Sequence, residues 1–297
     1  MQYTFFDFLT LVGSLGLFLY GMKMMSEALQ KVAGDRLRKI LSAMTSNRFL
    51  GIITGFMVTA MVQSSSATTV MIVSFVNAGL VSVTESIGVI MGANIGTTLT
   101  GWIITLFGFK VKISAYSLPL IGLGLPFIFS KSGTRRSYGE LLIGFALIFL
   151  GLEYLKGSVP DIQENPEVLS FLQQFTGGGI WTTLFFLGNG TLLTVIVQSS
   201  SATMALTFVM CNQGWIEFSH AAAMILGENI GTTITANIAA SVANLSAKRA
   251  ARVHLIFNML GVAWMLLVFN NFTGLIDTMM SNNGGASPSE SPAAIPT

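Results

Sequence analysis

Val62-Gln63-Ser64-Ser65-Ser66-Ala67-Thr68 is a polar stretch inside a long apolar segment, and the same seven residues return at positions 197–203. A second polar stretch follows each copy. Gly92-Ala93-Asn94-Ile95-Gly96-Thr97-Thr98 follows the first, and Gly227-Glu228-Asn229-Ile230-Gly231-Thr232-Thr233 follows the second. Corresponding residues of the two copies lie 135 positions apart in both motifs. Two motifs duplicated at one offset indicate that the chain contains one structural unit twice.

The composition places these motifs in a membrane. Hydrophobic residues make up 52% of the chain and charged residues 9%, and the mean hydropathy is +0.70. A soluble domain has about 25% charged residues. We therefore predict a multi-pass protein of the cell (inner) membrane, in contact with the lipid bilayer. The single cysteine, Cys211, excludes a disulfide framework. The basic residues lie beside apolar segments rather than on a soluble basic face, which argues against a nucleic-acid partner.

The length of the first motif segment predicts a re-entrant hairpin. Residues 50–79 would form a helix about 45 Å long at 1.5 Å per residue, whereas the hydrocarbon layer is about 30 Å thick. Two half-helices that meet at the Gln-Ser-Ser-Ser stretch solve this mismatch, provided that protein or a wet cavity surrounds the tip. In the next segment, residues 86–107, the glycines and Asn94 predict an interrupted membrane helix.

Both halves of the chain follow the same predicted plan. The first repeat, residues 1–133, has a span over 8–29, an amphipathic helix over 31–48, the hairpin, the interrupted helix and a proline-containing span over 113–130. The second repeat, residues 134–280, has a span over 141–155, a hairpin within 168–214, an interrupted helix over 220–242 and a closing span over 255–276. Residues 281–297 are expected to be a flexible tail or a truncated loop.

Three crossings in each repeat force the two repeats into opposite orientations. With the amino terminus outside, most basic residues fall on the cytoplasmic side, as expected from the positive-inside rule: Lys23, Lys31, Arg36, Arg38, Lys39, Arg48, Lys131, Arg135, Arg136, Lys248, Arg249 and Arg252. Lys110, Lys112 and Lys156 fall outside, as do Asp161, Glu164 and Glu167. The predicted fold is an all-α membrane protein with inverted-topology repeats, two re-entrant helical hairpins, two interrupted transmembrane helices and both ends outside.

Inverted repeats with broken helices are typical of secondary transporters. The amino terminus of each second half-helix presents unpaired N–H groups and a partial positive charge, which suit an anion. No lysine or arginine lies within the four polar stretches. A bound oxyanion would therefore need a cation beside it, and hydroxyl and carboxamide oxygens are ligands suited to Na⁺. The candidate Na⁺ ligands are Gln63, Ser66, Thr68, Asn94, Thr97, Thr98, Gln198, Ser201, Thr203, Asn229, Thr232 and Thr233.

The paired Gln-Ser-Ser-Ser and Asn-Ile-Gly-Thr-Thr stretches resemble those of the type II sodium-phosphate cotransporter family, and the resemblance covers residues 5–280. It implies symport of inorganic phosphate with Na⁺, with no enzymatic reaction and no organic cofactor. It also implies that the Gln-Ser-Ser-Ser stretches form the substrate and sodium sites. The implied phosphate-binding residues are Gln63, Ser64, Ser65, Ser66, Gln198, Ser199, Ser200 and Ser201.

The sequence leaves several alternatives open. Glu228, which takes the place of Ala93, is a candidate cation ligand or gating residue, or else a structural hydrogen-bonded group. Serine, threonine and glycine also serve close helix packing. The cargo could be another oxyanion such as sulfate or arsenate, H⁺ could replace Na⁺, and a channel is a further alternative. The oligomeric state is left open, with a homodimer as one candidate.

An enzyme, namely an intramembrane serine hydrolase, is the alternative to a transporter. A serine nucleophile needs a neighbouring base and a turn of the Gly-x-Ser-x-Gly type. Neither serine triplet has that turn, and the two histidines, His220 and His254, do not occupy matching positions in the repeats. We expect His254 to have a structural role near a helix end.

Overall fold

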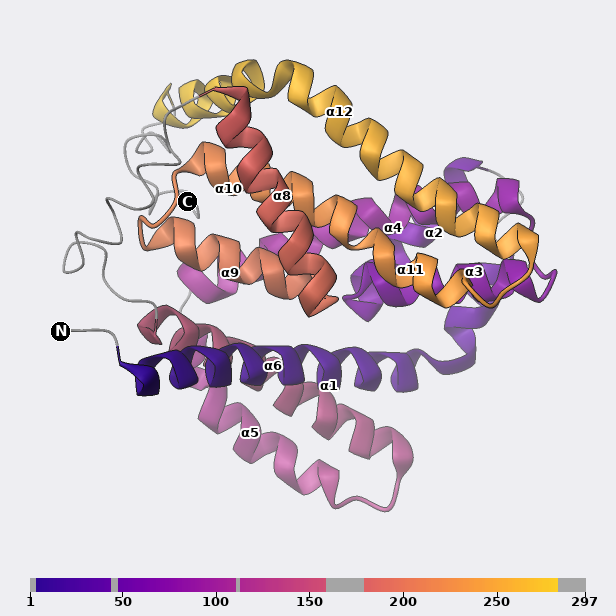
Figure 1. The fold of residues 1–297 in the computed structure, drawn as a ribbon. Coiled ribbons are helices and arrows are strands. Elements are labelled where there is room, and N and C mark those ends of the chain that lie inside the picture. Colours follow the sequence, from indigo (N-terminus) through magenta and orange to yellow (C-terminus); the bar gives the residue numbers. More distant parts are fainter. Residues whose placement is uncertain (1–3, 44–47, 111–112, 159–178, 283–297) are drawn as a thin grey trace. The chain divides into compact units, whose positions relative to one another are not determined.

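The computed structural model describes residues 4–43, 48–110, 113–158 and 179–282, and these contain helices and no strand (Figure 1). The predicted all-α class is confirmed for this part of the chain. The expected tail lies almost entirely outside the described residues, as do Lys112, Asp161, Glu164 and Glu167. The chain forms two compact units. Unit 1 comprises Met1–Ser14, Glu153–Thr232 and Asn258–Thr297, and unit 2 comprises Leu15–Leu152 and Thr233–Phe257.

Unit 2 contains most of the amino-terminal half. Its elements are α1 (Phe5–Ala43) from Leu15 on, α2 (Arg48–Val62), α3 (Ser65–Asn77), α4 (Val83–Ile103), the π-helix η1 (Ile104–Lys110), α5 (Ser114–Ile128), α6 (Gly133–Ser158) up to Leu152, α11 (Thr233–Ala240) and the start of α12 (Leu245–Asn282). Buried apolar residues of α2, α3 and α4 form one core with alanines of α11 and α12. This core supports the segment where α2 gives way to α3.

Unit 1 contains the second motif. Its principal elements are α8 (Ile180–Val197), α9 (Ser200–Asn212), α10 (Phe218–Gly231) and the remainder of α12. Phe186 of α8, Cys211 of α9, Met224 of α10 and Phe269 of α12 share one buried apolar cluster. The two arms α8 and α9 therefore pack with α10 much as α2 and α3 pack with α4.

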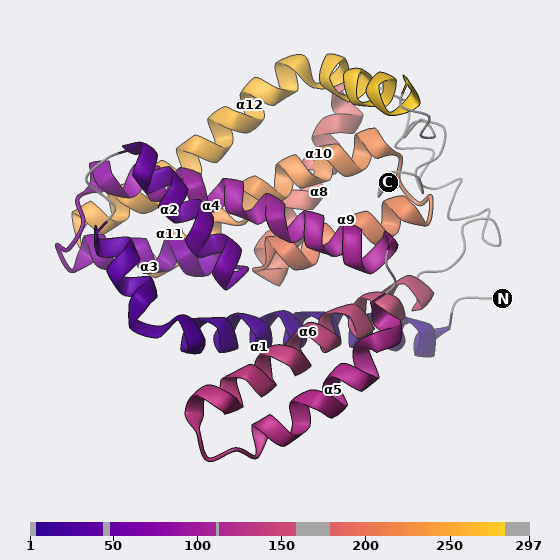
Figure 2. The same cartoon turned by 180° about the vertical axis from the view of Figure 1, so that it is seen from behind.

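Glycines allow α2 and α4 to approach closely in unit 2 (Figure 2). A Cβ atom on Gly55 would overlap the carbonyl oxygen of Val89, and one on Gly92 would overlap that of Ile52. The predicted interruption at residues 92–98 is wrong in this repeat, because α4 continues without a break through Asn94. Here Gly92 and Gly96 serve close contact between helix backbones rather than a change of backbone direction.

In unit 1 the corresponding glycines also lie at a close crossing. A Cβ atom on Gly190 of α8 would overlap the carbonyl oxygen of Met224, and one on Gly227 of α10 would overlap that of Leu187. In this repeat the helix does end inside the polar stretch. α10 ends at Gly231 and α11 begins at Thr233, in agreement with the predicted interruption.

Helix lengths differ from the prediction at three places. α1 runs without a break from Phe5 to Ala43, so the basic segment predicted as a separate amphipathic helix over 31–48 continues the first span through Ala43. α5 has 15 residues, fewer than the roughly 20 that one crossing needs. α8 has 18 residues and is apolar, although it was predicted as an arm of a hairpin.

Five helices are therefore long and apolar enough to cross a membrane in the described part of the chain, against the six crossings predicted. They are Phe5–Val32, Val83–Phe109, Gly133–Ser158, Ile180–Val197 and Leu245–Ser281. These findings support a multi-pass membrane protein. The number of crossings and the side on which each end lies stay predictions.

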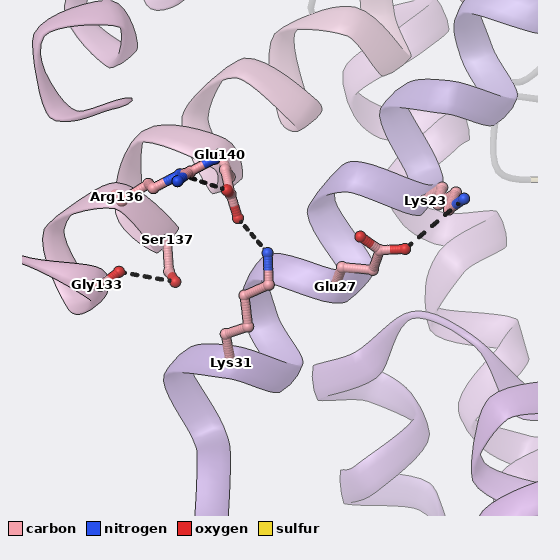
Figure 3. A network of polar contacts seen from close by, with 7 residues as sticks. All are labelled: Lys23, Glu27, Lys31, Gly133, Arg136, Ser137 and Glu140. Carbon is pink, nitrogen blue, oxygen red and sulfur yellow. Dashed lines mark hydrogen bonds and ion pairs between the residues drawn. The ribbon is translucent and has the colours of Figure 1, made fainter. Parts of the chain in front are cut away.

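Ion pairs connect α1 and α6 in unit 2 (Figure 3). Lys31 Nζ of α1 lies 2.7 Å from Glu140 Oε2 of α6, and Arg136 Nε lies 3.3 Å from the other oxygen of the same carboxylate. Glu140 is the most buried of the three side chains. Near the same pairs, a Cβ atom on Gly144 of α6 would clash with the backbone of α1. Close backbone packing and a shared carboxylate thus fix α6 against α1.

Candidate functional site

The first Gln-Ser-Ser-Ser stretch forms a sharp break between two helices. α2 ends at Val62, and Gln63 takes the left-handed conformation with a φ of 56°. The Gln63 N–H still donates to Thr59 O, 2.7 Å away, as at a helix end. Ser64 is extended, and its hydroxyl accepts a hydrogen bond from Ala67 N at 3.1 Å. Serine is a favoured residue at a helix amino terminus for this reason, so α3 starts at Ser65.

The second stretch repeats this conformation in the other unit. Gln198 has a φ of 55°, and its N–H donates to Thr194 O at 2.8 Å. Ser199 is extended, and its hydroxyl accepts from Ala202 N at 3.3 Å. Among the described residues, these two glutamines are the non-glycine residues with positive φ. The helix break predicted at each motif is confirmed, and its backbone geometry is the same in both units.

A left-handed glutamine is an unfavourable choice on backbone grounds alone. Such a conformation costs about 1–3 kcal/mol for a non-glycine residue and persists where surrounding contacts hold it. Glycine would adopt it without that cost. Both breaks nevertheless have glutamine at this position. We infer that the carboxamide of the glutamine has a role that offsets the cost of the backbone conformation.

Both the oxygen and the nitrogen of the Gln63 carboxamide form hydrogen bonds within unit 2. Thr100 Oγ1 of α4 donates to Gln63 Oε1 at 3.1 Å, and Gln63 Nε2 donates to Ala60 O. Gln63 is 5% exposed and Thr100 is 2% exposed. Beside them, Thr59 Oγ1 donates to Thr68 Oγ1 at 3.0 Å. Thr100 was not among the predicted site residues, although it lies one helical turn after Thr97 on the same face of α4.

A cavity of about 230 Å³ adjoins this pair in unit 2. Its wall is mainly apolar and comes from α1, α2, α4 with η1, and α6. Gln63 and Thr100 are the polar side chains in its lining. Open space thus reaches the buried carboxamide from the side of α1 and α6.

The serines at the two breaks are partly or fully buried. Ser65, Ser200 and Ser201 are buried, whereas Ser64, Ser66 and Ser199 are half-buried. Gln198 is exposed, whereas Gln63 is buried. The hydroxyl of Thr68 donates to Ser64 O and that of Thr203 donates to Ser199 O, each at 3.0 Å. Each break therefore places several hydroxyls and the first N–H groups of a helix at one point.

The second polar stretch of the first repeat is divided between two faces of α4. Thr97 is buried, but Thr98 is exposed and donates to Ile95 O. Asn94 Oδ1 lies 3.1 Å from Nε2 of His254, a fully buried residue of α12. The expected position of His254 near a helix end is wrong, because His254 lies within α12 and against a candidate cation ligand, while its structural role stays a prediction.

In the second repeat, Glu228 is the buried acid of the polar stretch. It is 1% exposed, and its Oε1 accepts a hydrogen bond from Thr207 Oγ1 of α9 at 2.7 Å. Thr207 lies outside both motifs and was not predicted. Thr203, Thr232 and Thr233 are buried, and Asn229 is half-buried.

Comparison with known proteins identifies relatives along most of the chain. The model of the Na⁺/Pi-cotransporter family matches residues 17–157 and 166–281. The uncharacterized protein YqeW of Bacillus subtilis is 32% identical over 265 residues, which cover 88% of this chain and 82% of YqeW. No solved structure matches.

Two other relatives carry functional names. The Salmonella typhimurium protein named "Putative inorganic phosphate export protein YjbB" is 31% identical over 272 residues, 91% of this chain and 48% of that protein. The chain thus spans about half the length of this relative. Sodium-dependent phosphate transport protein 2A of Rattus norvegicus is 43% identical over 100 residues, 32% of this chain and 15% of that protein.

Proposed function

Because this chain belongs to the Na⁺/Pi-cotransporter family, we propose that it is a secondary active symporter that imports inorganic phosphate together with Na⁺. The family is one of transporters rather than enzymes, which agrees with the absence of a hydrolase turn at the serine triplets. Phosphate and Na⁺ are the partners that the family name implies. The coupling to Na⁺ and the inward direction are the new parts of the proposal.

The observation that carries the proposal is the shared left-handed glutamine at the two helix breaks. Each break ends one helix and starts another, so it frees carbonyl oxygens from the first and N–H groups from the second. The N–H groups and serine hydroxyls suit phosphate, whereas the carbonyl, carboxamide and hydroxyl oxygens suit Na⁺. The helix break of each repeat thus offers hydrogen-bond donors for phosphate and oxygen ligands for Na⁺.

The proposed architecture places these two points together in the membrane. Residues 1–133 and 134–280 are two inverted repeats, and α2–α3 and α8–α9 are re-entrant hairpins whose tips meet near the midplane. Irregular backbone is tolerated at that depth where it lines a wet cavity. Alternating exposure of a site between the repeats would then move the cargo. Both ends of this chain are placed on the outer side of the cell membrane.

The ligands follow from the two motifs. Phosphate is assigned to the glutamines and serines of both breaks, Gln63 to Ser66 and Gln198 to Ser201. Na⁺ is assigned to oxygens of the same glutamines, of Ser66 and Ser201, and of Thr68, Asn94, Thr97, Thr98, Thr203, Asn229, Thr232 and Thr233. Burial supports Thr97 in this set more than Thr98, because Thr98 lies on the exposed face of α4.

Export of phosphate is the second candidate function. It is favoured by the name of the Salmonella relative, whereas the name of the rat protein specifies sodium dependence. A symporter works in either direction according to its gradients. The direction found in proteoliposomes must therefore be read together with the direction of the imposed Na⁺ gradient.

Labelled phosphate flux in proteoliposomes tests the proposal. With an inward Na⁺ gradient, the reconstituted chain should accumulate phosphate above the external concentration, and replacing Na⁺ by K⁺ should remove the accumulation. A proton gradient supplied without Na⁺ distinguishes H⁺ coupling. Phosphate that equilibrates without accumulating under every gradient would identify a channel and contradict the proposal. Unlabelled sulfate and arsenate, added in turn as competitors, define the oxyanion that the site accepts.

A further inference from the structure

The two repeats differ at a pair of buried positions whose side chains are in contact in the second repeat. Glu228 corresponds to Ala93, and Thr207 corresponds to Ile72, each 135 positions apart. Ala93 and Ile72 are both fully buried in unit 2, so the first repeat has an apolar pair there. The second repeat has instead a carboxyl group and a hydroxyl that are joined by a hydrogen bond of 2.7 Å. The substitution of both members together suggests a polar site that belongs to the second repeat.

The pair leaves oxygen atoms available for a ligand. Glu228 is 1% exposed, and its Oε2 has no hydrogen-bond partner within the described residues. The hydroxyl of Thr194 on α8, which is fully buried, also has none in that part of the chain. The Cβ of Thr194 packs against Gly231, one helical turn after Glu228 on α10. Thr207 of α9 thus contacts the Glu228 carboxylate directly, and Thr194 of α8 lies against the next turn of α10.

The three helices that bear these oxygens contribute no positive charge to balance the carboxylate. The sequences of α8, α9 and α10 contain no lysine or arginine. Of the titratable groups on the elements around it, Cys211 lies near the far end of α9, Asp277 lies on α12, and Glu217 precedes α10. Lys156 of α6 lies beside the far end of α9, where its carbonyl oxygen accepts a hydrogen bond from Gln213. His220 lies two turns before Glu228, stacks on Phe186 and lies 3.9 Å from Glu217. A buried carboxylate without a partner is costly, so it requires a mobile positive charge.

We infer that Glu228, Thr207 and Thr194 form a binding site for one monovalent cation, Na⁺ or a proton, that the first repeat lacks. The inference rests on the proposed function, because it assigns one of the coupled positive charges to this site. The bound cation neutralises the carboxylate, and its release leaves a buried negative charge. One monovalent cation balances the single carboxylate charge, and the oxygen ligands suit a hard cation rather than a transition metal.

Glu228→Gln is the variant that tests this site, because it keeps the shape of the side chain and removes its charge. Purified wild-type protein in phosphate-free detergent should gain thermal stability on addition of Na⁺. In Glu228→Gln the Na⁺ concentration for half-maximal stabilisation should rise about tenfold or more, since a full ligand charge is lost. In proteoliposomes the variant should carry one positive charge fewer per phosphate, measured from labelled Na⁺ and phosphate fluxes.

A proton at the same site gives a different and equally defined result. The Na⁺ dependence of stability then stays as in the wild type, whereas the dependence of stability and flux on pH becomes flatter in Glu228→Gln. Glu217→Gln is the matched control for the Na⁺ dependence, because Glu217 precedes the same helix with its side chain 65% exposed, and it should leave that dependence unchanged. Unchanged dependence on both Na⁺ and pH in a folded Glu228→Gln variant would overturn the inference.

Thr207→Val keeps the test decisive if Glu228→Gln does not fold. This variant retains the carboxylate and removes the hydroxyl that donates to it. It should weaken the response to Na⁺ or shift the response to pH, and wild-type responses in both would contradict the site. Failure of the proposed function is a separate outcome. Wild-type protein that moves no phosphate refutes symport, while the stability measurements still decide whether Glu228 binds a cation.

Discussion

Gln63→Gly should reduce Na⁺-driven phosphate uptake by about 10- to 100-fold, the loss expected when a buried hydrogen-bonding group to a charged ligand is removed. Glycine adopts a φ of 56° without strain, so the backbone of the break should be retained. What disappears is the carboxamide, together with its bond from Thr100. The measurement is labelled phosphate uptake in proteoliposomes, with the amount of inserted protein matched to the wild type.

Companion variants separate loss of function from loss of fold. Gln63→Gly leaves the buried hydroxyl of Thr100 without its acceptor, and Gln63→Gly combined with Thr100→Val removes that orphan group. The double variant should regain stability and remain inactive. Gln198→Gly makes the same change at the second break and should cause a comparable loss of uptake. Near wild-type uptake by both single variants would refute the role assigned to the glutamines.

Gly92→Ala should destabilise the protein by about 3 kcal/mol or more, because its Cβ would overlap the carbonyl oxygen of Ile52 in the neighbouring helix. In a helix without such a neighbour, the same change usually stabilises by up to about 1 kcal/mol. Gly122→Ala on α5 is the control, because no heavy atom of the described chain lies within 4 Å of a Cβ built there. Thermal unfolding in detergent should therefore shift in opposite directions for the two variants.

The result also distinguishes two interpretations of Gly92. If the glycine serves close contact between α2 and α4, alanine is harmful. If it instead serves a break in a membrane helix, as the sequence predicted, alanine opposes the break only through its helix propensity, and the loss of stability should be about 1 kcal/mol. A stable Gly92→Ala variant would mean that the close crossing of α2 and α4 is wrong.

The helix breaks were predicted from the sequence at the correct residues. The role predicted for several glycines was wrong. A run of polar residues within an apolar segment of excess length leaves few alternatives to a break, and Gln63 and Gln198 lie there in both units. A glycine, in contrast, permits either an unusual backbone angle or a close neighbour. Only the position of α2 decides between these for Gly92 and Gly96. Local sequence does not contain that information.

The candidate site was predictable where it lies inside the duplicated motifs and not elsewhere. Thr100, Thr207 and His254 contact predicted residues across 37, 21 and 160 positions of the chain, respectively. Contacts at such separations depend on tertiary packing rather than on spacing. One signal was available for Thr207, because it replaces Ile72 at the same offset at which Glu228 replaces Ala93.

Equilibrium binding of labelled phosphate to the purified protein in Na⁺ tests most directly whether the two breaks form a single site. We expect about one phosphate bound per chain, and we expect Gln63→Gly or Gln198→Gly alone to remove nearly all of it, since a shared site weakens when either half is lost. Two phosphates per chain, or binding that each single variant reduces by about half, would contradict the account, because each break would then bind its own phosphate.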